Sequence, residues 1–167
     1  LATIQVDLTM LPERMQCEFI DTDGQPKRPV VIHRAIFGSY ERFVAILTEH
    51  FAGAFPTWLA PVQARVLPIS EKHAVYAQQV HARLREARVR AELDDRNEKL
   101  GYRVRDAQVR KIPYVLVVGE REAQNGTASV RARGGVDLGA LPVESVLAQL
   151  AAEIASRSAT LTVGQSA

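Results

Sequence analysis

The chain has 167 residues, enough for one ordinary domain or for one small domain joined to a piece of another. Hydrophobic residues make up 47% and charged residues 24%, which excludes a mainly disordered chain, and no apolar run is long enough to span a membrane. The single cysteine, Cys17, excludes an intrachain disulfide, and 21 basic against 19 acidic residues are too nearly balanced to indicate a nucleic-acid binder by themselves.

The first 52 residues predict three strands followed by a helix. Apolar and polar residues alternate or cluster over short segments, and a run of turn formers at 21–26 separates two of them. These strands are expected at 2–8, 16–20 and 29–33. Apolar side chains at helical spacing then predict a helix that is capped by Ser39 and reaches Phe51. The chain begins with Leu1, without a signal peptide, which suggests a piece of a longer protein.

A segment with two prolines and the only tryptophan, 53–61, marks the junction between two units. Beyond it strands and helices alternate, and Asn125-Gly126 is a strong turn signal. The strands are expected at 62–68, 88–93, 114–118 and 128–133, and the helices at 70–87, 98–110 and 142–154. The pattern predicts an α/β domain over 62–157 with a mixed sheet flanked by helices, and a flexible tail over 158–167.

Basic residues concentrate between Arg96 and Lys111, where six cations and two carboxylates give a local charge of +4. On a helix Arg103 and Arg110 would share a face, which suits contacts to phosphate. Asn97 and Glu122 are suitable in type for addressing unstacked RNA bases. The alternative is a solvated helix face, balanced by the nearby acidic residues Glu92, Asp94 and Asp95.

Four segments resemble one family. Residues 28–43, RPVVIHRAIFGSYERF, resemble the third signature motif of class II aminoacyl-tRNA synthetases, and HRAI within them points to the threonyl branch. Residues 55–63, FPTWLAPVQ, are similar to that family's junction between catalytic and anticodon-binding domains. DRNEKLGY at 95–102 and KIPY at 111–114 continue the resemblance, which covers about residues 1–157.

The resemblance implies a threonine–tRNA ligase, which activates threonine with ATP and Mg²⁺ and transfers it to tRNA-Thr. The family holds Zn²⁺ with one cysteine and two histidines, and the substrate's amino and hydroxyl groups bind the metal. His33 matches the last of these ligands and Gln5 matches a glutamine of the amino-acid site. Without the family, His33 would be an ordinary histidine at the end of an apolar strand, and Cys17, which does not match the zinc cysteine, an ordinary small apolar residue.

Arg42 matches the catalytic arginine of the motif, which contacts ATP phosphates, and Ser39 would lie beside the nucleotide. A helix start offers free N–H groups to phosphate, and arginine adds a planar charged fork. The alternative for Arg42 is a surface ion pair with Glu41 or with another neighbour.

In the second unit the resemblance implies that four residues contact anticodon bases: Asn97, Lys111, Glu122 and Arg131. Lys111 departs from members that carry arginine there, and lysine loses bidentate recognition. The family further implies a homodimer in the cytoplasm.

The first two class II motifs and the other zinc ligands do not occur in this sequence, so the chain is expected to be an inactive C-terminal fragment. It would comprise a remnant of the antiparallel catalytic sheet at 1–52 and an intact anticodon-binding domain at 62–157. Two alternatives stay open: a stand-alone module of the same fold that binds RNA or protein without chemistry, and a generic α/β domain that binds a small molecule. No Gly-rich phosphate loop supports the latter.

Overall fold

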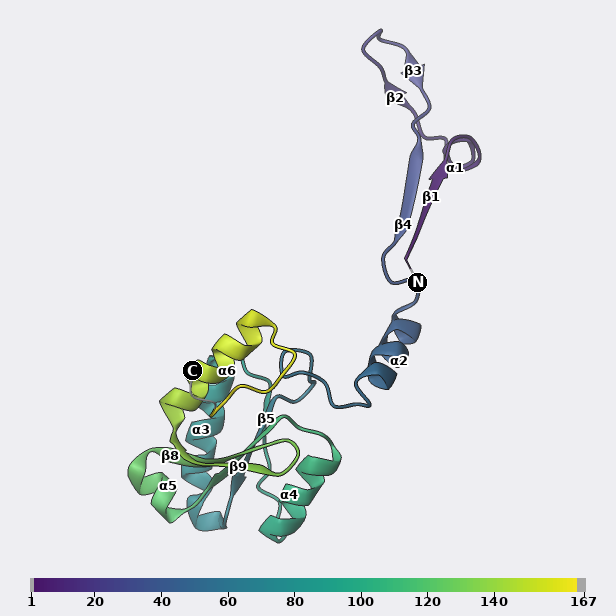
Figure 1. The fold of residues 1–167 in the computed structure, drawn as a ribbon. Helices are drawn as coiled ribbons and strands as arrows, with labels where there is room; N and C mark the ends of the chain where they lie inside the picture. The colour runs from purple at the N-terminus through teal and green to yellow at the C-terminus, as the bar shows by residue number, and fades with distance from the viewer. Residues whose placement is uncertain (1, 165–167) are drawn as a thin grey trace. The chain divides into compact units, whose positions relative to one another are not determined.

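The structure is a computed structural model that describes residues 2–164 (Figure 1). The chain forms two compact units, which divide between His50 and Phe51, so the junction at 53–61 belongs to the second unit. Within residues 2–164 no helix is both long and apolar enough to cross a bilayer.

The first unit consists of two antiparallel ribbons and two helices. Its elements are β1 (Thr3–Asp7), α1 (Met10–Arg14), β2 (Phe19–Ile20), β3 (Pro26–Lys27), β4 (Val31–Ala35) and α2 (Tyr40–His50). β1 pairs with β4, and β2 pairs with β3. The Asp7 carboxylate accepts the backbone N–H groups of Thr9 and Leu11 at 3.2 and 3.1 Å, which fixes the start of α1. The sequence pattern does not predict this short helix.

The β1–β4 ribbon has two unlike faces because side chains alternate along each strand. Ile4 and Val6 of β1 share one face with Ile32 of β4, and all three are more than half exposed. Gln5 and His33 lie on the other face. An exposed apolar sheet face of this kind favours packing against further structure.

The second unit is a five-stranded mixed sheet with helices on both faces, which confirms the predicted α/β fold. Its elements are β5 (Ala64–Pro68), η1 (Glu71–His73), α3 (Ala74–Glu86), β6 (Ala91–Leu93), α4 (Leu100–Val109), β7 (Tyr114–Val118), α5 (Glu120–Asn125), β8 (Thr127–Ala132), β9 (Val136–Pro142) and α6 (Val143–Ser156). The strand order is β6-β5-β7-β8-β9. β5 is parallel to β6 and β7, whereas β8 and β9 are antiparallel to their neighbours.

Helices cover both faces of the sheet (Figure 1), and a hydrophobic layer lies between the sheet and the helices on each face. Alternate residues of β5, β7 and β8 pack against α3 and α6 in the larger layer, which includes Val66, Leu116 and Leu150. The intervening residues, including Leu67 and Val117, pack against α4 on the opposite face. The continuous apolar strands β5 and β7 are thus buried on both faces, as parallel strands usually are.

The predicted flexible tail needs correction over 158–164. Val163 is almost fully buried in the larger layer, and its N–H donates to the Tyr114 hydroxyl at 3.2 Å. The Glu153 carboxylate on α6 accepts hydrogen bonds from Thr162 N–H at 2.6 Å, from the Tyr114 hydroxyl at 2.7 Å and from the Thr57 hydroxyl. This buried carboxylate holds the junction, the sheet and the segment after α6 together. The remainder of the predicted tail, 165–167, lies outside the described residues.

Candidate nucleic-acid interface

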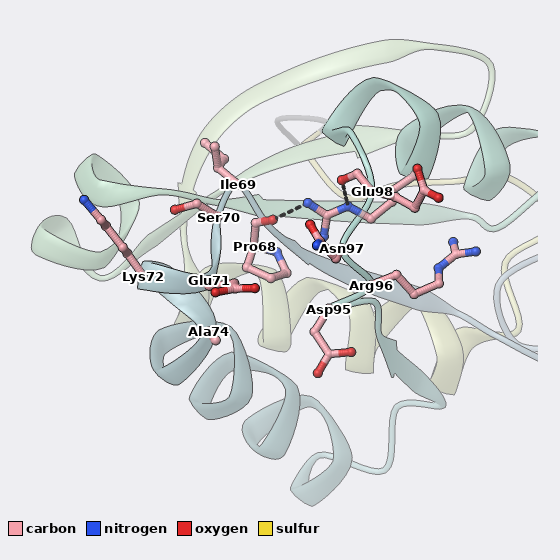
Figure 2. Close-up of a pocket in the computed structure, with 11 residues that line it drawn as sticks. Pro68, Ile69, Ser70, Glu71, Lys72, Ala74, Asp95, Arg96, Asn97 and Glu98 are labelled. Atoms are coloured by element: carbon pink, nitrogen blue, oxygen red, sulfur yellow. Dashed lines mark hydrogen bonds between the residues drawn. The ribbon is translucent and has the colours of Figure 1, made fainter.

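A crevice opens at the carboxyl ends of β5 and β6. β5 continues into α3 on one face of the sheet and β6 into α4 on the other, so the two connecting loops diverge. The strand order reverses beside this crevice, between β5 and β7, and ligands of open α/β sheets commonly bind outside the carboxyl ends of the strands near such a reversal. The loops Pro68–Lys72 and Asp95–Glu98 line a cavity of about 410 Å³ there, and Figure 2 shows them facing one another.

Arg103 lies beneath the crevice and is only 4% exposed. Its guanidinium donates to the carbonyl oxygens of Pro68, Asp94 and Glu98 at 2.7, 2.8 and 3.1 Å, two of them drawn as dashed lines in Figure 2. The expectation that Arg103 contributes to an exposed phosphate-binding face is therefore wrong. Burial of a cation requires such partners, because an unpaired buried charge is strongly destabilising.

Much of the positive charge in the Arg96–Lys111 segment is neutralised locally. Arg96 donates to Asp94 at 2.8 and 2.7 Å and to Asp106 at 3.1 Å. The buried Arg65 of β5 donates to Asp106 at 2.7 Å and to Glu92 at 2.7 Å. The hydrogen bond from Arg96 lowers the pKa of Asp94, and the one from Arg65 lowers the pKa of Asp106.

This network makes the second unit sensitive to acid. In the unfolded chain the two aspartates have a pKa near 3.8, and in the folded chain their pKa is lower. Their contribution to stability is therefore complete above about pH 4 and is lost as the pH falls further. We expect Asp106→Asn to reduce the loss of stability between pH 7 and about pH 3, as measured by the urea midpoint of Trp58 fluorescence.

Asp95→Asn is the matched control, because Asp95 is an exposed neighbour that forms no ion pair with residues 2–164. The difference in urea midpoint between pH 7 and about pH 3 should be the same in this variant as in the parent chain. An Asp106→Asn variant with the parent's full acid sensitivity would contradict the assignment.

Asn97 and Glu122 lie at the same end of the sheet. Asn97 is exposed in the cavity lining (Figure 2). Glu122 Oε2 accepts the Gly119 N–H at 3.0 Å at the start of α5. A Cβ on Gly119 would lie 2.5 Å from the side chain of Ile69, which lines the cavity, and 3.1 Å from Glu122 Oε2. Glu122 therefore lies near Ile69, but its side chain is not one of those that line the cavity.

Lys111 and Arg131 lie away from this crevice. Arg131 of β8 pairs in register with Val115, near the amino end of β7, and its guanidinium is 3.6 Å from the Asp137 carboxylate. Lys111 precedes β7 in the left-handed conformation, with φ of 57°, and its ammonium group donates to the Ala52 carbonyl. This hydrogen bond uses one of the three donors of the ammonium group and holds it beside Ala52.

In the first unit the structure brings together residues that the sequence separates. Gln5 and His33 are direct partners in the β1–β4 register, so both side chains stand on one face of the ribbon.

Ser39 precedes α2, and its hydroxyl accepts the Arg42 N–H at 3.4 Å and donates to Glu41 at 2.7 Å. The hydrogen bond from the Ser39 hydroxyl lowers the pKa of the Glu41 carboxyl. Arg42 forms no ion pair with any residue between 2 and 164, so the predicted alternative of a pair with Glu41 is not observed.

The residues present do not make a zinc site. A protein zinc site needs three or four ligands, and no group of three His, Cys, Asp or Glu side chains within residues 2–164 is placed to hold a metal. His33 alone supplies one imidazole, and no chemical step is assigned to a metal in this chain.

Comparison with known proteins gives the family. Residues 63–153 match the model of the family described as "Anticodon binding domain", and residues 1–51 match the one described as "tRNA synthetase class II core domain (G, H, P, S and T)". The chain therefore belongs to the anticodon-binding domain family, and its first 51 residues are similar to part of a class II tRNA synthetase core.

Two relatives with similar sequences are threonine–tRNA ligases. Over 156 residues, 93% of this chain, it is 56% identical to a threonine–tRNA ligase of Caldanaerobacter subterraneus and 54% identical to that of Phocaeicola vulgatus. The matched part is 24% of each of these proteins, so the chain spans about a quarter of their length.

Solved structures agree with these relatives. The RNA binding domain of threonyl-tRNA synthetase from Cryptosporidium parvum matches 91% of this chain and 38% of its own, at 34% identity and a TM-score of 0.74. Prolyl-tRNA synthetase from the same organism, at 20% identity, shares the fold with a TM-score of 0.63 over 87% of this chain and 32% of its own.

Proposed function

We propose that the chain is part of a threonine–tRNA ligase and that its second unit binds the anticodon of tRNA-Thr. The proposal rests on the similarity to threonine–tRNA ligases over both units, together with a crevice that presents Asn97 where open α/β sheets bind ligands. An asparagine amide has both donors and an acceptor, and so is able to read the edge of an unstacked base.

The four proposed anticodon contacts would act at two places. Asn97 and Glu122 would address bases at the crevice. The Glu122 Oε2 atom accepts the Gly119 N–H, whereas Oε1 accepts no hydrogen bond from residues 2–164 and could accept one from a base. Arg131 and Lys111 would bind nearer the opposite end of the sheet. Arg131, close to half exposed, would exchange its weak pairing with Asp137 for RNA.

The first unit would contribute to the ligase reaction only as part of the whole enzyme. Gln5 on the polar face of the ribbon would line the threonine site, and Ser39 and Arg42 at the start of α2 would contact ATP, which such enzymes use with Mg²⁺. His33 would be one ligand of a Zn²⁺ site completed from elsewhere in the enzyme. The exposed apolar face with Ile32 suits burial against more of the catalytic sheet. A homodimer in the cytoplasm belongs to the same proposal.

The test is a titration of the chain with an unmodified tRNA-Thr transcript at several salt concentrations. We expect binding that weakens steeply as salt rises, and that weakens by about tenfold or more when one anticodon base is exchanged. Equal affinity for the exchanged transcript would contradict anticodon recognition. With threonine and ATP the same preparation should form no adenylate, and formation of adenylate would show that the chain holds a complete catalytic centre.

A further inference from the structure

The loop that carries Asn97 has few hydrogen bonds of its own. It leaves the sheet after Asp94, whose N–H donates to the Val66 carbonyl at 3.0 Å, and ends where α4 begins. Within it, the Glu98 N–H donates to the Arg96 carbonyl at 2.7 Å, and the Arg96 N–H and guanidinium donate to the Asp94 carboxylate. No ladder continues past β6 among the described residues, and none of these bonds within the loop reaches the β5 side of the crevice. Something other than the sheet must therefore fix the place of Asn97.

The Arg103 guanidinium supplies that connection. Asp94 and Glu98, which accept from NH1 and Nε, are the residues on either side of 95–97. Pro68, which accepts from NH2, is the last residue of β5 and forms the facing lip of the crevice. The Arg103 guanidinium thus connects both ends of the Asn97 loop to the end of β5.

We propose that Arg103 is a positioning residue for anticodon discrimination: by joining the carbonyls of Pro68, Asp94 and Glu98 it holds Asn97 at the distance from the β5 lip at which a base is read. This inference deepens the function proposed above and rests on it. Arg103 lies at the floor of the cavity, but its side chain is only 4% exposed and each of its three nitrogens donates to a protein carbonyl, so it acts on the RNA through the loop.

Lysine cannot take over this role although it keeps the charge. An ammonium group is a single point with three tetrahedral donors, whereas the three carbonyls are met by a rigid, planar, diverging fork. Arg103→Lys therefore separates two explanations. A cation that merely attracts phosphate tolerates lysine, whereas a residue that fixes a loop by its shape does not.

The experiment compares the affinities of Arg103→Lys for tRNA-Thr transcript, for the transcript with one anticodon base exchanged, and for an unrelated RNA of equal length. We expect the ratio of Kd values between exchanged and cognate transcripts to fall about tenfold relative to the parent chain, with little change for the unrelated RNA. Asn97→Ala should cause the same loss, and the double variant should lose no more, because both changes remove one recognition event.

Arg85→Lys is the matched control, because Arg85 is exposed on α3 and forms no ion pair with residues 2–164; it should behave as the parent chain. An Arg103→Lys variant that keeps the parent's discrimination overturns the proposal, and so does equal weakening towards all three RNAs. If the parent chain itself does not discriminate, the function proposed above fails instead.

A second measurement applies if Arg103→Lys does not fold, as judged by its urea transition. In the parent chain labelled with ¹⁵N at arginine, the Arg103 Nε–H should exchange slowly with solvent and keep its chemical shift when the cognate transcript is added. Rapid exchange, or a shift like that of an arginine in contact with RNA, would show that Arg103 does not act from within the protein.

Discussion

Replacing Glu153 by alanine is expected to lower the free energy of unfolding of the second unit by about 4 kcal/mol. The carboxylate is 2% exposed and accepts four hydrogen bonds, from the hydroxyls of Thr57 and Tyr114 and from the N–H and hydroxyl of Thr162. Alanine leaves these buried donors without an acceptor, and each unsatisfied group costs about 1–3 kcal/mol. Urea denaturation followed by the fluorescence of Trp58, the only tryptophan, measures the loss.

Two further variants make this result specific. Glu153→Gln keeps the shape and one acceptor oxygen, so its loss should be about half as large, because hydroxyls reorient but the Thr162 N–H does not. Glu86→Ala, on the exposed side of α3, should change stability by less than about 0.5 kcal/mol. A loss below about 1 kcal/mol for Glu153→Ala would show that the network does not stabilise the unit.

Arg65→Met is expected to destabilise the second unit by about 3 kcal/mol. The Arg65 side chain is 2% exposed and binds Asp106 and Glu92, whose carboxylates lose their buried cation in the variant. The loss falls at the lower end of the range for broken buried pairs, because both carboxylates are partly solvated.

Arg110→Met is the matched comparison, since Arg110 lies 3.5 Å from Glu92 and both side chains of this pair are exposed to solvent, at 50% and 38%. Its loss should stay within about 1 kcal/mol, as for exposed pairs generally. Equal losses for the two variants in urea denaturation would contradict the view that burial of the Arg65 cation makes its removal costly.

The strongest elements of the fold could be predicted from the sequence because their signals are local. β7 is a continuous apolar run, and α6 has a regular apolar stripe. By contrast α5 was missed, because Asn125-Gly126 suggested a hairpin turn whereas Gly126, with φ of 67°, ends a six-residue helix. β9 was also missed, since it follows Gly134-Gly135 and contains Gly139 beside an irregularity in its pairing with β8.

The site was predictable in part, for the same reason. The resemblance implies that Asn97 and Glu122 contact bases; the structure shows Asn97 in the lining of the crevice, while the assigned contacts stay predictions. The roles of Arg65, Arg103 and Glu153 could not be foreseen, because each depends on partners far away in the sequence. Helical spacing put Arg103 on a face with Arg110, but Pro68, 35 residues earlier, decides that its side chain turns inward.

The Glu153 carboxylate also has a consequence for motion in the second unit. Thr57 near the start of this unit and Thr162 near its end are bound to the same acidic group, so neither stretch can fray without disturbing the group that holds the other. Local opening of the two ends is therefore cooperative, and the amide hydrogens at both places should exchange with solvent at a common free energy.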